Sequence, residues 1–170
     1  KDMEGYTNLM MLVSLGFTEG FYSKPRVDKE LLEKYSKGLI CLSGCIAGEV
    51  SSLLLEGNIK EAEKSANFFQ DIFGSGNFYM EIQDNGLEDQ KKIIAPLMEL
   101  SKTSLIPLVA TNDCHYLKKE DAYFHDVLLC INTNKLVNDP DRMRFGSDLF
   151  YYRPPQEMIE TFSYVPDAIK

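Results

Sequence analysis

The sequence predicts an α/β fold built around a parallel sheet or barrel. Three apolar runs, at residues 39–42, 78–83 and 105–110, have the length and composition of strands. Between them lie stretches with apolar residues at helical spacing, at residues 47–55, 58–73 and 87–102. Strands that alternate with helices are typical of βαβ units, in which the strands run parallel.

The first forty residues are expected to form two helices and a loop. Apolar side chains recur at the spacing of one helical face over residues 4–15, and residues 16–26 are rich in glycine and aromatic residues. Asp28 predicts the start of a short helix that runs to Tyr35, because its carboxylate can accept hydrogen bonds from the free N–H groups of the first turn. The run at residues 39–42 is then predicted to be a buried strand.

Two helices are predicted between the first and second strands. The first covers residues 47–55 and ends before Gly57. The second begins after Asn58 and runs to Gly74, because asparagine favours the N-cap and glycine readily adopts the left-handed conformation found after a last turn. After the second strand, Asn85-Gly86 predicts a turn.

Pro96 interrupts the helical pattern of residues 87–102, which predicts a kink or two separate helices. The strand at residues 105–110 is entered through a proline and is predicted to be buried on both faces. Strict alternation of strand and helix ends near Lys118. Beyond it we expect a helix over residues 121–131, a polar loop over residues 132–140, a short strand over residues 149–152 and a last helix starting at Pro154-Pro155.

Polar residues follow two of the predicted strands directly. Asp113 and His115 come after residues 105–110, and on an extended backbone two such residues point the same way. Cys45 comes after residues 39–42. Because parallel strands end at one edge of a sheet, the three side chains could converge there. Thiolate, carboxylate and imidazole together suit zinc or a similar transition metal.

Each of these residues also has a structural interpretation. His115 can hydrogen-bond Asp113 as an ordinary loop pair, and Cys45 can be a small buried hydrophobe. His125 lies beside Asp126 on a predicted helix that offers no second candidate ligand at helical spacing. We therefore interpret His125 as structural.

Three weaker candidates concern ligand binding. Glu81 and Gln83 share one face of the second strand, so Glu81 could reach a metal or orient a ligand, or be a satisfied polar residue near a sheet end. Lys24 and Arg26 flank a proline that stiffens their loop, which suits phosphate binding. A solvated charged loop explains the same pattern equally well.

Length, composition and charge describe an ordinary globular domain. The 170 residues are 44% hydrophobic and 26% charged, with a formal net charge of −8. This acidity argues against a nucleic-acid platform, although a larger nucleic-acid enzyme can carry its basic groove elsewhere. The four cysteines lack zinc-ribbon spacing and suggest reduced thiols in a cytoplasmic protein, and neither a signal peptide nor a membrane span is predicted. The opening Lys1 and the helical pattern that begins with it suggest a fragment of a longer chain.

The motifs, taken in order, resemble the polymerase-and-histidinol-phosphatase (PHP) domain in the form found in bacterial replicative DNA polymerases. The resemblance spans essentially the whole chain with compatible spacings. It is carried by Glu4-Gly5-Tyr6-Thr7-Asn8-Leu9-Met10, Lys24-Pro25-Arg26-Val27-Asp28, Leu42-Ser43-Gly44-Cys45-Ile46-Ala47-Gly48-Glu49, Glu81-Ile82-Gln83-Asp84, Ala110-Thr111-Asn112-Asp113-Cys114-His115-Tyr116 and His125-Asp126-Val127-Leu128-Leu129-Cys130-Ile131.

The resemblance implies part of a distorted (β/α)7 barrel whose first strands are missing. Residues 1–118 would form the C-terminal portion of this metal-binding barrel, and residues 119–170 the connection toward the polymerase palm. Cys45, Asp113 and His115 would occupy ligand positions, for zinc or manganese rather than magnesium. The family's remaining ligands include an earlier His-x-His, whereas this chain has only His115 and His125, so the metal site is expected to be incomplete.

The implied function is support of DNA-directed DNA synthesis, with metal-dependent 3′–5′ proofreading in some members. The parent enzyme would use DNA, deoxynucleoside triphosphates, magnesium and other replisome subunits, and no membrane. The fragment alone is expected to be inactive and to self-associate through apolar surface left bare, for example at Leu9, Met10 and Val13. The alternatives are a stand-alone metal-dependent phosphoesterase, such as a histidinol phosphatase, and a non-catalytic scaffold.

Overall fold

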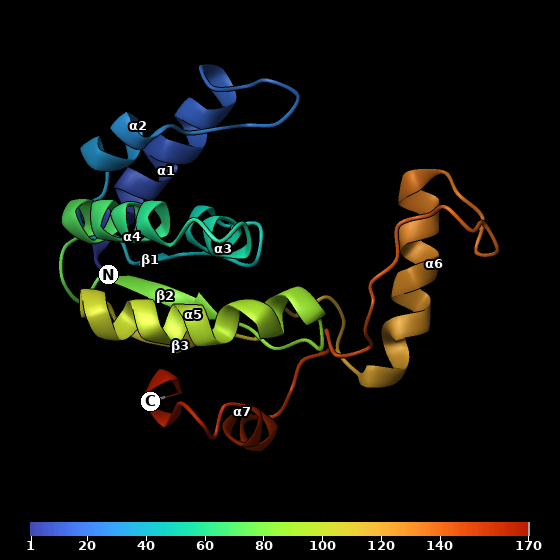
Figure 1. Ribbon diagram of the computed structural model, residues 1–170. Helices are drawn as coiled ribbons and strands as arrows, with labels where there is room; N and C mark the ends of the chain where they lie inside the picture. The colour runs from blue at the N-terminus through green and yellow to red at the C-terminus, as the bar shows by residue number, and fades with distance from the viewer. Residues whose placement is uncertain (170) are drawn as a thin grey trace. The chain divides into compact units, whose positions relative to one another are not determined.

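The computed structural model describes residues 1–169 and confirms the predicted α/β class (Figure 1). The chain forms two compact units. The first comprises Lys1–Met80 and Leu100–Pro107, and the second comprises Glu81–Glu99 and the chain from Leu108 onward. The predicted domain boundary near Lys118, between the barrel portion and the connection that follows it, stays a prediction.

Helices at the start of the first unit begin at aspartate caps. Helix α1 spans Met3–Thr18, and the Asp2 carboxylate accepts a hydrogen bond from the Gly5 N–H at 2.9 Å. Helix α2 spans Lys29–Lys34, and Asp28 accepts from the Leu31 N–H at 2.9 Å, which confirms the predicted cap. Helix α1 is longer than the predicted helix over residues 4–15, and the loop after it is correspondingly shorter.

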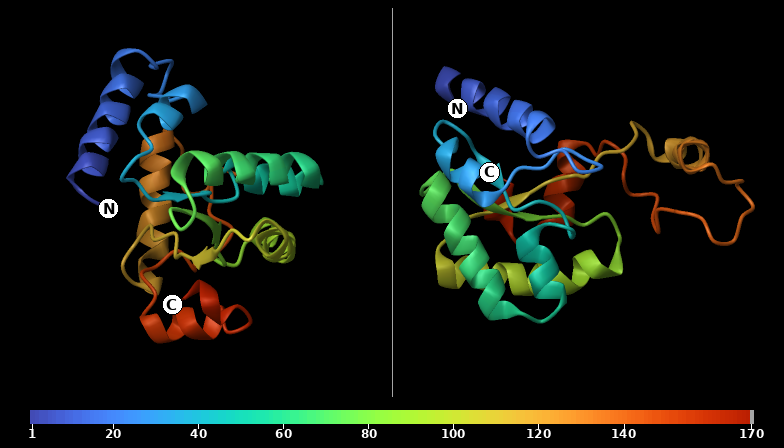
Figure 2. Two further views of the ribbon diagram at one scale, coloured as in Figure 1. Left: turned by 90° about the vertical axis from the view of Figure 1, so that its left-hand side faces the viewer. Right: turned by 90° about the horizontal axis from the view of Figure 1, so that it is seen from above.

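Helices α3, Glu49–Leu55, and α4, Ile59–Phe73, lie side by side in the same unit (Figure 2). Both helices have small and branched side chains that are buried, namely Val50, Leu54, Ala62 and Ala66. Gly74 ends α4 with a φ of 84°, a conformation that glycine adopts without strain. Asn58 occupies the predicted N-cap position, but its side chain donates to Glu56 instead of capping the helix.

The strands β1 (Cys41–Leu42), β2 (Phe78–Ile82) and β3 (Leu108–Ala110) form one sheet in the order β1-β2-β3. Strand β1 pairs with β2 in parallel, with Cys41 opposite Phe78. On the other edge of β2, the Met80 N–H donates to Pro107 at 2.9 Å, and the Thr111 N–H donates to Ile82 at 3.1 Å. From the first bond to the second, the residue numbers increase on both strands, which is the pattern of a parallel pair. The predicted parallel sheet is confirmed.

Two of the strands are shorter and less buried than the sequence predicted. Strand β1 has two residues, and its Leu42 is exposed, because β1 has a neighbour on one side alone in this sheet. Leu105 has a φ of 58°, which is left-handed rather than extended, so β3 begins only at Leu108. All three residues of β3 are half-buried, so the prediction of a strand buried on both faces is wrong.

Helix α5, Glu88–Ser104, contains Pro96 without being divided, so the predicted split is wrong. Proline removes one backbone hydrogen bond at this point. The apolar stripe of Ile93, Leu97 and Leu100 is nevertheless buried on both sides of it. Burial of a continuous face outweighs the local cost of the proline.

The second unit contains the helices α6, Ala122–Thr133, and α7, Pro155–Thr161, together with short 3₁₀ turns at Lys119–Asp121 and Pro166–Ala168. Both α-helices were predicted. The predicted strand at residues 149–152 is reduced to a single parallel bridge between Tyr116 and Tyr151. Across residues 1–169, no helix has the length and apolar character needed to cross a membrane.

Gly5 and Gly16 provide a matched pair of substitutions within α1. A Cβ on Gly5 would overlap the carbonyl of Gly38, whereas a Cβ on Gly16 would meet the Arg26 carbonyl oxygen at 3.4 Å, an ordinary contact. We expect Gly5→Ala to lower the free energy of unfolding by about 1–3 kcal/mol through overpacking. Gly16→Ala should be neutral or stabilising, because alanine favours a helix. Denaturant unfolding followed by circular dichroism measures both, and equal effects would contradict the packing at Gly38.

Candidate functional site

The clearest polar cluster in the second unit follows β3. The Oδ1 atom of Asp113 lies 3.2 Å from Nε2 of His115, and the two side chains are 38% and 36% exposed. The predicted common direction of these two side chains is confirmed. Both groups are accessible to solvent and to a ligand.

The separation of these two atoms fits two ligands of one metal ion. With metal–ligand bonds of about 2.0–2.1 Å, adjacent ligands on a tetrahedral ion lie roughly 3.3 Å apart. A carboxylate oxygen and an imidazole nitrogen are both suitable donors for zinc. Within residues 1–169, however, no group of three or more His, Cys, Asp or Glu side chains is arranged to hold a metal. The pair therefore fits two ligands of a metal site and does not form a complete set of ligands.

Backbone and ring contacts fix the position of His115. Its N–H donates to the Phe150 carbonyl at 2.7 Å. Its ring packs edge-on against Phe145 and Phe150, at centroid distances of 4.7 Å and 5.5 Å. The imidazole is thus held by an aromatic wall on one side while its Nε2 atom faces Asp113.

His125 on α6 is a neighbour that the sequence analysis did not predict. Its ring centroid lies 5.4 Å from that of His115 and 4.8 Å from that of Phe145. Burial, followed by the neighbouring His115, lowers the pKa of His125 below its ordinary value of 6.5, while Asp126 opposes this shift. No local pattern signals this pairing, because the two histidines belong to different elements.

A cavity of about 330 Å³ lies beside His125, lined by residues of α6 and of the loop that follows it. In Figure 1 this loop returns from the far end of α6. Asp126 receives two hydrogen bonds from the Arg142 guanidinium, whose side chain is only 4% exposed. These bonds lower the pKa of the Asp126 carboxyl. The ion pair ties the loop to the helix and so forms one wall of the cavity.

Cys45 belongs to the first unit, in the turn between β1 and α3. Its thiol is exposed, so its interpretation as a buried hydrophobe is wrong. The Cys45 carbonyl accepts a hydrogen bond from the Gly48 N–H at 2.8 Å, which closes the turn. An exposed thiol at the end of a strand retains the access that a metal ligand needs.

Of the remaining candidates, Glu81 and Arg26 make contacts within the protein. The Glu81 carboxylate accepts hydrogen bonds from the Thr111 hydroxyl and, at 3.1 Å, from Gln83, which agrees with a satisfied polar residue near a sheet end. The Arg26 guanidinium donates to the Tyr22 carbonyl and lies 5.3 Å from the centre of the Tyr22 ring. Lys24 is exposed in the same loop. Phosphate binding by Lys24 and Arg26 stays a prediction.

Replacing Asp126 with asparagine tests the ion pair. Asp126→Asn leaves the nearly buried Arg142 without an anionic partner, so we expect a lower melting temperature. Since the native state lowers the pKa of Asp126 below 3.8, the pair stabilises the fold above that pH. This contribution is lost as the pH falls through the native pKa.

The difference in melting temperature between the wild type and Asp126→Asn should therefore be large near neutral pH and shrink below pH 3.8. Thermal unfolding across that range measures it. Asp141→Asn, an exposed carboxylate in the same loop, is the control and should change little. A difference that does not vary with pH would contradict the role of this ion pair.

Comparison with known proteins identifies the family. The sequence profile of the PHP domain matches residues 1–85. The chain is 46% identical over 169 residues to the DNA polymerase III subunit alpha of Treponema pallidum, a match that covers 99% of this chain and 14% of the relative. It is 39% identical over its whole length to the Borreliella burgdorferi subunit, covering 15% of that protein. It is also 45% identical over 158 residues to the Thermus aquaticus subunit, covering 93% of this chain and 13% of that protein.

The chain spans between 13% and 15% of the length of these three relatives. The profile match covers half of the chain and includes β1, Cys45 and β2. This chain belongs to the PHP domain family.

Proposed function

We propose that this chain serves as the PHP segment of a bacterial replicative DNA polymerase, DNA polymerase III subunit alpha. The observation that supports this most strongly is the extent of similarity, which covers 99% of the chain in the Treponema pallidum match and so continues beyond residue 85. A stand-alone phosphoesterase would not need the polymerase-like stretch after residue 121. In this proposal the whole enzyme is cytoplasmic, acts with other replisome subunits, and uses DNA, deoxynucleoside triphosphates and magnesium.

The segment's own contribution would be architectural support and a metal centre. We assign Cys45, Asp113 and His115 as metal ligands, with zinc or manganese rather than magnesium, because thiolate and imidazole donors suit transition metals better than they suit magnesium. When bound, such a metal would activate a water molecule for phosphodiester hydrolysis. Asp113 and His115 would hold the ion, and the rings of Phe145 and Phe150 would fix the imidazole and limit water on that side.

An exchange of segments tests the proposed role in DNA synthesis. This chain would replace the 45%-identical segment of the Thermus aquaticus subunit, and primer extension would be measured. We expect the chimera to retain most of the polymerase activity, because the same elements would support the same catalytic domain. The control is that subunit with the segment deleted. A chimera no more active than the deletion would contradict the proposal.

Metal binding by the 170-residue chain tests the ligand assignment. We expect weak binding, in the micromolar range or poorer, because the donors assigned here leave coordination positions open. Cobalt(II) is a suitable probe, since a cobalt–thiolate bond adds a charge-transfer absorption. Cys45→Ala should abolish this absorption, and Asp113→Ala and His115→Ala should each weaken binding roughly tenfold or more.

Cys114→Ala is the matched control for this experiment, because Cys114 is also an exposed thiol and lies between Asp113 and His115. It should preserve both the absorption and the affinity. If Cys45→Ala and Cys114→Ala behave alike, the assignment of Cys45 is wrong. Submicromolar binding of zinc by the chain would contradict the expected open site.

A further inference from the structure

His115 rests on a short extended segment, Leu149 to Tyr152, that runs beside it. The Phe150 carbonyl accepts from the N–H groups of His115, at 2.7 Å, and Tyr116, at 3.3 Å. The Tyr152 N–H donates back to the Tyr116 carbonyl at 3.0 Å. Because the Phe150 ring also packs on the imidazole, a shift of this segment would displace both the backbone and the ring of His115.

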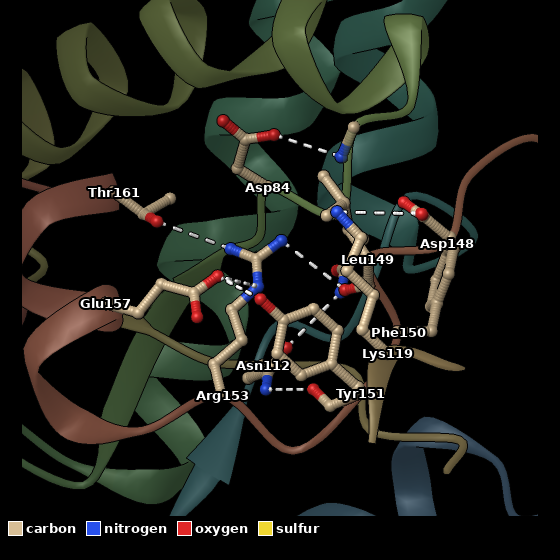
Figure 3. Close-up of polar contacts among 12 residues, drawn as sticks. Asp84, Asn112, Lys119, Asp148, Leu149, Phe150, Tyr151, Arg153, Glu157 and Thr161 are labelled. Carbon is tan, nitrogen blue, oxygen red and sulfur yellow. Dashed lines mark hydrogen bonds and ion pairs between the residues drawn. The ribbon is translucent and has the colours of Figure 1, made fainter. Parts of the chain in front are cut away.

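Two asparagine side chains hold this segment on either side of Phe150. The Asn112 amide donates to the Tyr151 carbonyl at 2.7 Å, a bond visible in Figure 3. The Asn85 amide donates to the Leu149 carbonyl at 2.8 Å and to the Asn112 side-chain oxygen at 3.3 Å. The carbonyls of Leu149 and Tyr151 are therefore fixed from outside the segment, and the Phe150 carbonyl between them accepts from the backbone of His115 and Tyr116.

Asn85 is itself held firmly. It is only 1% exposed, and its backbone N–H donates to the Gln90 side chain at 2.7 Å. The Gln90 amide, also buried, donates back to the Asn85 side-chain oxygen at 3.3 Å. This leaves the Asn85 amide nitrogen to face Leu149 and Asn112. A buried, satisfied chain of amides can hold a rigid position that a solvated loop cannot.

We propose that Asn85 and Asn112 are positioning residues that orient His115 through the backbone of Leu149 to Tyr152. An amide suits this role because it can both donate to a carbonyl and accept from a neighbouring amide. A carboxylate of nearly the same shape can only accept, and it would face the carbonyl oxygen of Leu149 or Tyr151 with a like partial charge. The consequence for metal binding rests on the proposed function, whereas the orientation of His115 does not.

The variants Asn85→Asp and Asn112→Asp test the proposal in the 170-residue chain. Amide hydrogen exchange of His115 reports the bond to Phe150, and the chemical shifts of the His115 ring protons at one fixed pH report its packing on the Phe150 and Phe145 rings. We expect exchange to accelerate roughly fivefold to tenfold in each variant, as the loss of about one supporting hydrogen bond would produce. We also expect the ring shifts to move toward those of an unpacked histidine.

Asn77→Asp in the first unit is the matched control, because the Asn77 amide also donates to a carbonyl, that of Phe73, at 2.8 Å. Exchange of the α4 amides monitors the fold. Asn85 is buried and its variant could fail to fold, but Asn112 is only half-buried and provides the second test. Unchanged His115 exchange and ring shifts in folded Asn112→Asp would overturn the proposal, as would equal changes in Asn77→Asp.

Cobalt(II) affinity of the same variants separates this proposal from the metal assignment. If the proposal is correct and the pair binds metal, both variants should bind cobalt about tenfold or more weakly than the wild type, as the loss of a supporting residue does elsewhere. A wild type that binds no cobalt would count against the proposed metal centre alone. The exchange and shift measurements would still decide whether Asn85 and Asn112 orient His115.

Discussion

The structure depends first on the backbone hydrogen bonds of β2, which has a partner strand on each edge. Its Tyr79 carbonyl accepts from Ser43 at 3.0 Å, and its Met80 N–H donates to Pro107 at 2.9 Å. Parallel pairing requires each strand to return through a crossover, and here the crossovers are helical. It also places the residues that follow β3, including Asp113, at the carboxyl edge of the sheet, where chemistry is usual in α/β folds.

Position in the sheet does not fix the orientation of a side chain, and in the second unit further contacts fix that of His115. The rings of Phe145 and Phe150 pack against the His115 ring, while the Phe150 carbonyl accepts both the N–H of His115 and that of Tyr116. The buried Asn85 side chain, which accepts from the Gln90 amide, donates to the carbonyl of the adjacent Leu149. Such polar groups are tolerated in a protein interior because they satisfy one another.

Several basic side chains of the second unit hold loops in place. Arg142 is paired with Asp126, and Lys119 lies 3.5 Å from Asp148 (Figure 3). Arg153 is nearly buried between Glu157 and the Tyr151 ring. Together with the net charge of −8, this use of charge favours internal support over phosphate binding. It agrees with the proposed supporting role of this chain.

The sequence by itself determined the local features: the caps at Asp28 and Gly74, the last helix at Pro155, the alternation that predicts a parallel sheet, and the Asp113–His115 pair. These depend on neighbours within a few residues, so periodicity and capping preferences reveal them. Tertiary structure alone decided the shortness of β1, the continuity of α5 across Pro96, the contact of His115 with His125, and the hydrogen bond from Asn85 to Leu149. Asn85 and Leu149 are 64 residues apart, and no local propensity encodes a hydrogen bond between such distant residues, because packing of the whole unit brings them together.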